Sequence, residues 1–319
     1  MNLPKIHSIT KKLLVALLGG FLLLFLLFHM TANLFILRHD DGAWYSAFCH
    51  FMGTNWVVKV FEVVLFVTLL CHAVLSLWLA ITNRQARPVR YRQRSRTKTH
   101  PHSKLMMWTG ILIAACLILH FFDFYFVKVG WVDAQYMVRT DSFVQDEYDG
   151  MLQQLASQGL TGEDVIAEME EYASSQNLST EEQSELDKNI QMIRDKMTLY
   201  DIMNRAVREH RVSADGQWIH QMSKDDCDQL RAILPEADTD PDFYYIARQK
   251  FSVLHIVLSY LFFFVVVFMH LSHAFPSAFQ TLGLNGYKYN GWIAWCGKFY
   301  AWIILIGFSA VPILIYLGF

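Results

Sequence analysis

Five long apolar runs divide the chain, and each is nearly free of charged residues. They cover 13–37, 57–81, 105–127, 251–275 and 292–317. About 20 apolar residues in a helix are enough to cross the hydrocarbon core of a bilayer, which is about 30 Å thick. The pattern therefore predicts an all-α membrane protein whose five transmembrane helices form a bundle.

The apolar runs divide the 319 residues into three parts. Residues 1–130 hold the first three transmembrane helices, residues 131–242 form a polar insertion, and residues 243–319 hold the last two helices. The first run is too long for the hydrophobic region of a secretory signal and is not followed by a small-residue cleavage site. We therefore expect it to be a membrane span.

The insertion is expected to be a small, acidic, mostly helical extramembrane domain. Capping-box patterns begin at Thr161, Ser179 and Ser223, and 181–211 carries one apolar stripe at helical spacing. No catalytic or metal-binding constellation is recognisable in it. Its candidate roles are a structural cap, which we favour, an oligomer contact, and a binding surface for an outer-side partner.

Charge is distributed unevenly, and this predicts an orientation. The segment 128–250 holds 25 acidic and 12 basic residues, although the net charge of the whole chain is only −2. Cytoplasmic loops of membrane proteins carry the excess of Lys and Arg. We therefore expect the N-terminus and the loop 82–104 on the cytoplasmic side of a bacterial inner membrane, and the insertion and C-terminus outside. The basic residues of this loop are Arg84, Arg87, Arg90, Arg92, Arg94, Arg96, Lys98 and Lys104.

Several classes of cofactor site are excluded by their missing motifs. The sequence has no C-x-x-C-H motif for covalent haem, no cysteine cluster for an iron–sulfur centre, and no glycine-rich Rossmann or P-loop pattern. The chain is not expected to bind nucleic acid.

Four histidines lie inside the apolar runs, one on each of four spans. They are His29, His72, His120 and His270. An imidazole in hydrocarbon is costly unless it has a partner, so an intramembrane histidine marks a candidate functional site. Four such residues predict two axial pairs, and two axial pairs predict two haems.

Depth in the bilayer groups these histidines in pairs. With 1.5 Å per residue, His29 and His120 lie about 12 and 10 Å below the outer boundary, whereas His72 and His270 lie about 13 and 18 Å from inner helix ends. The expected outer pair is therefore His29 with His120, and the inner pair is His72 with His270. Interhelical hydrogen bonding is the alternative role for such histidines. His273 lies one turn beyond His270 and is an alternative ligand.

Several segments resemble the di-haem cytochrome b subunit of succinate dehydrogenases and fumarate reductases, of the single-chain, five-helix type. The resemblance covers the five spans and the basic loop and skips the insertion. The segments that carry it are HMTANLF at 29–35, CHAVLSLWLA at 71–80, RPVRYRQRSRTKTH at 87–100, LMMWTGILIAACLILH at 105–120 and MHLSHAFPSAFQTLGLN at 269–285.

The resemblance implies two b haems, the outer one held by His29 and His120 and the inner one by His72 and His270. The family has a small residue four positions after the fourth-helix ligand, and Ala274 in that position favours His270. The implied function is that of the quinone-reactive membrane subunit of respiratory complex II, a tricarboxylic acid cycle enzyme. A flavoprotein subunit would interconvert succinate and fumarate. An iron–sulfur subunit, docked on the basic loop, would exchange electrons with membrane quinone, menaquinone being favoured, through the two haems.

Two acidic residues lie within the spans. Members of the resembled family use a glutamate near the outer end of the second helix to accept the quinol proton, and Glu62 is the candidate here. A carboxylate that reaches the interface near Lys59 is the alternative. Asp123 follows His120 by three residues and could orient a ligand ring.

Two rival functions stay open from the sequence. The chain could be the cytochrome b subunit of another quinone-linked oxidoreductase, of the hydrogenase or formate dehydrogenase type. It could also be a non-redox membrane transporter or anchor that uses its histidines for packing or proton relay.

Overall fold

The computed structural model describes residues 8–86, 101–140, 161–176 and 178–319, and these are mostly helical. Five helical spans within them are long and apolar enough to cross a membrane, which identifies a multi-pass membrane protein and confirms the five predicted spans. These spans are Ile9–Leu37, Trp56–Gln85, Leu105–Lys128, Leu254–Thr281 and Asn290–Tyr316.

The described chain folds as two compact units. The membrane unit comprises the chain up to His39, Ala47–Val132 and Ile246–Phe319. The second unit comprises Asp40–Ser46 and Asp133–Tyr245. Each unit is described by itself below.

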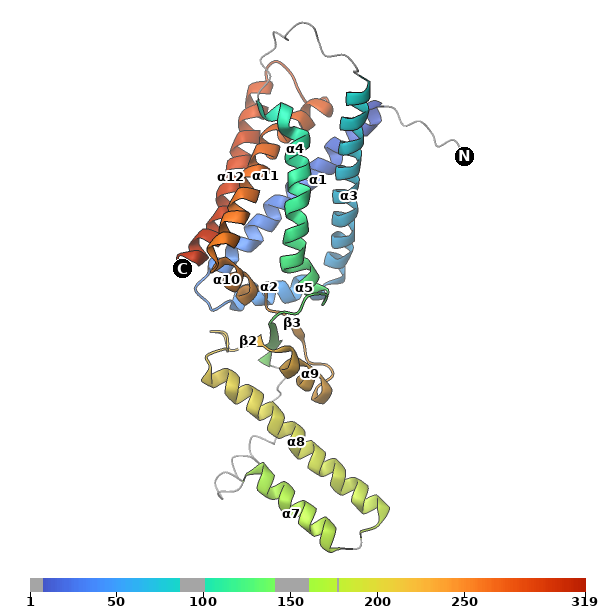
Figure 1. Cartoon of the computed structure of the whole chain (residues 1–319), viewed down its shortest axis with the longest axis vertical. Helices are drawn as coiled ribbons and strands as arrows, with labels where there is room; N and C mark the ends of the chain where they lie inside the picture. The colour runs from blue at the N-terminus through green and yellow to red at the C-terminus, as the bar shows by residue number, and fades with distance from the viewer. Residues whose placement is uncertain (1–7, 87–100, 141–160, 177) are drawn as a thin grey trace, which may run out of the picture. The chain divides into compact units, whose positions relative to one another are not determined.

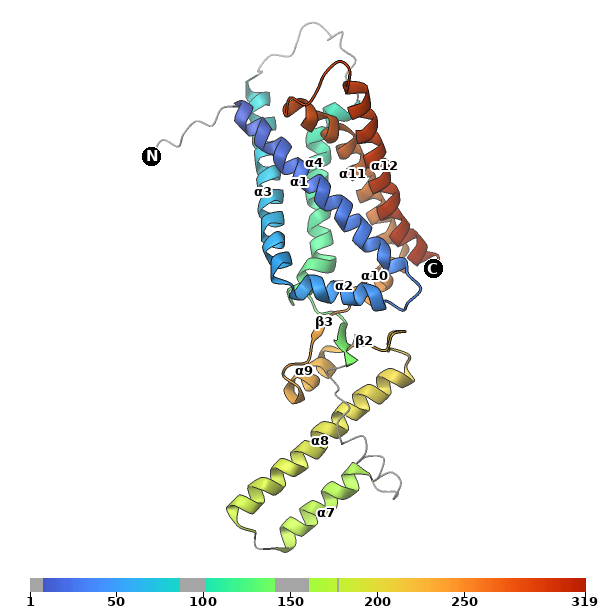
Figure 2. The ribbon, with the colours of Figure 1, turned by 180° about the vertical axis from the view of Figure 1, so that it is seen from behind.

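The membrane unit is built from five long helices, and α11 and α12 pack together most extensively. Helix α11 also packs along α4, and α1 crosses α3, α11 and α12 obliquely (Figures 1 and 2). Its core lies between α1, α11 and α12 and includes Met30, Leu271 and Ile304. The five helices are α1 (Ser8–Leu34), α3 (Trp56–Gln85), α4 (Pro101–His120), α11 (Leu254–Thr281) and α12 (Asn290–Tyr316).

Short helical segments extend or follow these spans. The 3₁₀ turn η1 (Phe35–Leu37) continues α1, and α2 (Ala43–Thr54) precedes α3. The chain after α4 continues as a π-helical turn, η2 (Phe121–Tyr125), and then as α5 (Phe126–Lys128). Helix α10 (Phe243–Phe251) leads into α11. The π-helical turn begins at the residue after His120, and such turns are frequent at functional sites.

Exposed tryptophans lie near both ends of the membrane unit. Trp56 and Trp131 are 74% and 76% exposed at the end where α3 begins, and Trp292 is 69% exposed where α12 begins. Tryptophan is enriched at both membrane–water interfaces because its ring is apolar and its N–H group is polar. These positions agree with the predicted limits of the hydrocarbon core.

The second unit contains a three-stranded antiparallel sheet that the sequence patterns do not predict. Its strand order is β2-β1-β3, with β1 (Tyr136–Arg139) in the middle, paired with β2 (Trp218–Met222) and β3 (Thr239–Pro241). Strands of three to five residues are too short to carry a clear alternation of apolar and polar positions. The prediction of a mostly helical insertion therefore missed this element.

Three helices of the second unit begin at the predicted caps. Helices α7 (Gly162–Ser175) and α8 (Thr180–Arg208) begin with complete capping boxes at Thr161 and Ser179. Helix α9 (Lys224–Ile233) begins at the N-cap Ser223. The stripe on α8 packs on α7 through the buried residues Ile166, Ile190 and Ile193. The C-terminal half of α8 joins β1, β2 and α9 in a second core formed by Val138, Ile202, Ala206, Ile219, Met222, Cys227 and Leu230.

Candidate functional site

The imidazoles of His29 and His120 are neighbours inside the membrane unit, and their ring planes are steeply inclined to each other. His29 is on α1 and His120 is the last residue of α4, and the ring centroids are 6.0 Å apart at an interplanar angle of 80°. Two imidazoles that bind one metal ion from opposite sides have centroids about 6 Å apart, because each metal–nitrogen bond is about 2 Å long. The spacing of this pair therefore fits two axial ligands of one iron.

Aromatic rings surround the pair. Phe25 stacks on His29 with a centroid distance of 5.3 Å, and Phe308 lies 5.7 Å from the same ring. Phe124 lies 5.3 Å from the ring of His120. These rings exclude water and present flat apolar faces, which suits an apolar cofactor better than a hydrated ion.

A hydrogen-bonded chain fixes the Nδ1 atom of His120. The Tyr260 hydroxyl donates to Oδ2 of Asp123 at 2.9 Å, so its oxygen can only accept from the Nδ1–H group of His120, 3.5 Å away. Lys250 donates to the other Asp123 oxygen at 2.6 Å. With its proton on Nδ1, His120 has a lone pair on Nε2, which is the state of a metal-binding imidazole.

His72 and His270, the predicted inner pair, also have hydrogen-bond acceptors at Nδ1. Nδ1 of His72 lies 3.2 Å from the carbonyl oxygen of Val15 on α1, which can only accept. Nδ1 of His270 lies 3.1 Å from the Thr109 hydroxyl, whose own proton is donated to the carbonyl of Met106 at 3.0 Å. Each imidazole therefore donates from Nδ1 and keeps Nε2 as a free base.

His29 differs from the other three histidines. Its Nδ1 lies 3.4 Å from the amide nitrogen of Asn33, and that nitrogen also donates to the His29 carbonyl at 2.7 Å. Nδ1 of His29 therefore faces a donor, whereas Nδ1 of each of the other three faces an acceptor. Its ring orientation follows from its contacts with Phe25, Phe308 and His120.

A glycine on a neighbouring helix lies against each inner histidine. A Cβ atom at Gly19 of α1 would lie 3.2 Å from Cε1 of His72, and one at Gly110 of α4 would lie 3.5 Å from Cε1 of His270. Small residues let side chains or backbones approach closely between membrane helices. The two glycines thus provide the space that the inner imidazoles occupy.

The paired histidines come from helices that are not close neighbours. Among the described residues, neither α1 with α4 nor α3 with α11 belongs to the helix pairs that pack extensively. Helices α3 and α4 bury only 6% of the residues in their most apolar segments, compared with 33% for α11 and α12. Limited direct packing between the two helices of each pair, α1 with α4 and α3 with α11, is what a cofactor inserted between their histidines requires.

Glu62 forms an ion pair with Lys128, and not with Lys59 as the alternative interpretation expected. The Glu62 side chain is 22% exposed, and the hydroxyl of Tyr125 also bonds to its carboxylate. Tyr125 ends the π-helical turn that follows His120. Glu62, the predicted proton acceptor on α3, is therefore hydrogen-bonded to η2, the turn that also contains Asp123.

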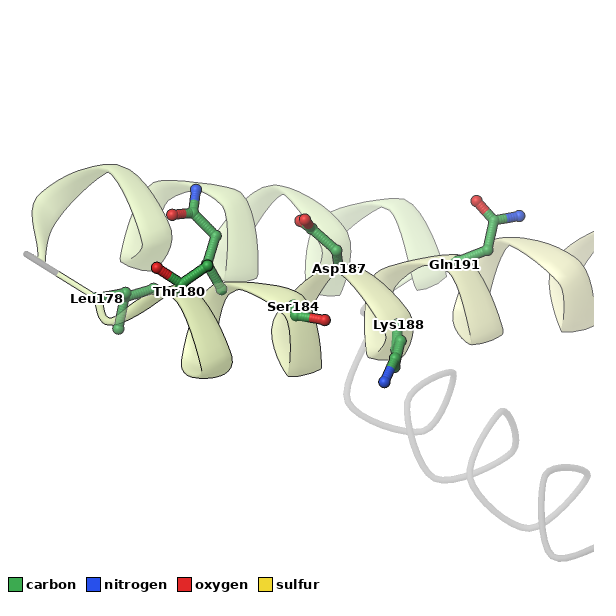
Figure 3. Close-up of a pocket in the computed structure, with 7 residues that line it drawn as sticks. Leu178, Thr180, Ser184, Asp187, Lys188 and Gln191 are labelled. Carbon is green, nitrogen blue, oxygen red and sulfur yellow. The ribbon is translucent and has the colours of Figure 1, made fainter.

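Other features carry no comparable chemistry. A shallow depression along α8 is lined by Leu178 and by polar side chains that include Asp187 and Lys188 (Figure 3). His220 of the second unit is buried, with Nδ1 3.1 Å from Asp242, and this pair links β2 to the start of α10. Residues 87–100 of the basic loop 82–104, which is predicted to face an iron–sulfur subunit, lie outside the described residues.

Comparison with known proteins does not identify the chain. No family model, no curated protein and no solved structure matches it. Within the described ranges, no group of three or more His, Cys, Asp or Glu side chains is placed to hold a metal ion.

Proposed function

We propose that the chain is the membrane-anchoring di-haem cytochrome b subunit of a succinate:quinone oxidoreductase. In this function it relays electrons between an iron–sulfur subunit and membrane quinone through two b haems. The observation that carries the proposal is the 6.0 Å spacing of the His29 and His120 rings, on two spans that do not pack extensively.

The spacing of the outer pair and the Nδ1 acceptors of His72, His120 and His270 support ligation of both haems, and His29 would ligate in the tautomer that does not accept from the Asn33 amide. His29 and His120 would hold the outer haem, and His72 and His270 the inner one. A haem iron with two histidine ligands supplies one-electron transfer. The chain contributes orientation, because acceptors at Nδ1 fix the rings of His72, His120 and His270 so that Nε2 is available.

The Glu62 carboxylate is the proposed proton acceptor for quinol oxidation, or donor for quinone reduction. Its partners Lys128 and Tyr125 surround it with hydrogen-bond donors at the end of the membrane unit nearer to the His29–His120 pair. A quinone needs protons as well as electrons, and a partly exposed carboxylate can exchange them with water. Menaquinone is the favoured substrate.

The proposed orientation follows from charge. The N-terminus and the loop 82–104 face the cytoplasm of a bacterium, and the second unit lies outside. An acidic surface on an iron–sulfur subunit would complement the loop, and the flavoprotein subunit would bind beyond it. Of the eight basic residues, Arg84 lies in the last turn of α3 and Lys104 lies in the first turn of α4.

Purification of the tagged full-length chain from its native membrane tests this function. We expect a flavoprotein and an iron–sulfur protein to co-purify, and succinate to reduce b-type haem in the complex. Co-purification with a hydrogenase or formate dehydrogenase would support the rival oxidoreductase. A pure chain without haem bands after dithionite reduction would instead favour a transporter or an anchor.

A further inference from the structure

We propose that Asp123, acting through the Tyr260 hydroxyl, is a positioning residue for His120 and lowers the reduction potential of the haem that His120 holds. The inference rests on the proposed function. It assigns the potential of the outer haem in part to three side chains of the membrane unit: Asp123 on η2, Lys250 on α10 and Tyr260 on α11.

The direction of each hydrogen bond supports the chain. Lys250 can only donate, so the Asp123 carboxylate accepts from it through Oδ1, and Oδ2 accepts from the Tyr260 hydroxyl at 2.9 Å. The Tyr260 oxygen is then an acceptor for the Nδ1–H group of His120. Each donor in the chain points toward the carboxylate, so the negative charge of Asp123 polarises the Tyr260 hydroxyl, and the hydroxyl polarises the imidazole.

The packing holds this arrangement in place. Tyr260 is 9% exposed, and its ring packs edge-on against Phe251 at 5.1 Å and Phe264 at 6.0 Å. The π-helical turn brings Asp123 toward Tyr260, because the extra residue in a π turn shifts the side chains that follow it. The bond between Tyr260 and Asp123 is partly buried and lined by aromatic rings, so the carboxylate charge is screened less than it would be in water.

His120 is distinct among the four histidines in its partners. Nδ1 lies against a backbone carbonyl in His72, a threonine hydroxyl in His270 and an amide nitrogen in His29. The partner of His120 is bonded in turn to a carboxylate, that of Asp123. The effect of Asp123 should therefore be confined to one of the two haems.

The sign of the effect follows from ligand basicity. A polarised Nδ1–H bond gives the imidazole anionic character, which raises its basicity as a ligand. A more basic ligand stabilises ferric over ferrous iron, so the potential falls. Removing the carboxylate or the hydroxyl should therefore raise the potential of the outer haem.

Redox titration of the purified complex followed at the b-haem absorption band tests this inference. Tyr260→Phe keeps the aromatic packing but removes the hydroxyl, and Asp123→Asn keeps the shape but removes the charge. We expect each variant to raise one of the two potentials, with a threefold to tenfold change in the ratio of reduced to oxidised haem, or about 28 to 59 mV for one electron. Asp123→Glu should restore most of the wild-type value.

Tyr300→Phe is the matched control, because Tyr300 is a membrane tyrosine whose hydroxyl donates to the Leu23 carbonyl at 2.6 Å. It should leave both potentials unchanged. Unchanged potentials in Tyr260→Phe and Asp123→Asn, or equal shifts of both haems, would overturn the inference. A wild-type complex without two b-haem steps would instead overturn the proposed function, so the two failures are distinguishable.

Discussion

Gly19 on α1 lies directly against the imidazole of His72 on α3. A Cβ atom at position 19 would come within 3.2 Å of Cε1, and Val15, one turn earlier on α1, accepts the Nδ1 proton of the same ring. One face of α1 therefore provides both the space for the inner ligand and the acceptor that orients it.

Replacement of this glycine should displace the inner ligand. Gly19→Ala forces the His72 ring to move by a few tenths of an ångström, and such overpacking typically costs about 1–3 kcal/mol. We expect lower occupancy or a shifted spectrum for one of the two haems. Gly20→Ala is the control, since a Cβ there meets nothing within 4 Å. Equal spectra for both variants would contradict this role of Gly19.

The five spans and the four histidines could be predicted from the sequence because both are local signals. A run of about 20 apolar residues identifies a span without knowledge of its neighbours. A histidine inside such a run is equally visible. The predicted spans and the capping boxes at Thr161 and Ser179 are confirmed for the same reason, since the residues of each lie within a few positions of one another.

The partners of the histidines could not be predicted, because they depend on how each helix is rotated in the bundle. Tyr260 is 140 positions from His120, and Thr109 is 161 positions from His270. Glu62 was expected near Lys59 from sequence distance, but it pairs with Lys128 on another segment. Gly19 and Gly110 carried a weak signal, because small residues mark close approach between membrane helices.

Glu62 should be required for quinone chemistry and not for haem binding. In Glu62→Gln we expect succinate-driven quinone reduction to fall roughly a hundredfold, as for loss of a general acid or base. The two b-haem bands should remain. Lys59→Gln removes an exposed charge from the same end of α3 and should retain activity. Wild-type quinone reduction in Glu62→Gln would contradict the assignment.

The capping box of α8 should stabilise the first turn of that helix. Ser179→Ala removes the N-cap, at a cost of about 1 kcal/mol, and we expect about fivefold faster hydrogen exchange in that turn. Ser184→Ala, an exposed change farther along α8, should not accelerate exchange. Similar exchange in both variants would show that the cap contributes nothing.

Acid should remove one half of the same capping box. Hydrogen bonds from the Ser179 backbone and hydroxyl lower the pKa of Glu182. A carboxylate with a lowered folded-state pKa stabilises the fold above its unfolded pKa, and this stability is lost as pH falls through the folded value. Exchange in the first turn of α8, corrected for the intrinsic rate, should therefore accelerate in acid. Glu182→Gln should remove most of this dependence, and an unchanged acid response would contradict it.

Cys227 should be unreactive in the folded protein. Burial raises the pKa of its thiol to about 12, and the residue is 1% exposed in the core of the second unit. Very little thiolate is therefore present at pH 8, so alkylation should be slow until the unit unfolds. Mass spectrometry of the peptide containing Cys227, with and without denaturant, measures this. Rapid labelling without denaturant would contradict the buried core.

Two haems per chain, held by the two histidine pairs, are the central feature of the proposed function. Quantitation of haem per polypeptide, in the wild type and in His120→Ala and His270→Ala, measures this. We predict two b haems per wild-type chain and one in each variant, with a different redox step lost in the two cases. A wild-type chain without haem, or variants that both keep two haems, would contradict the central claim.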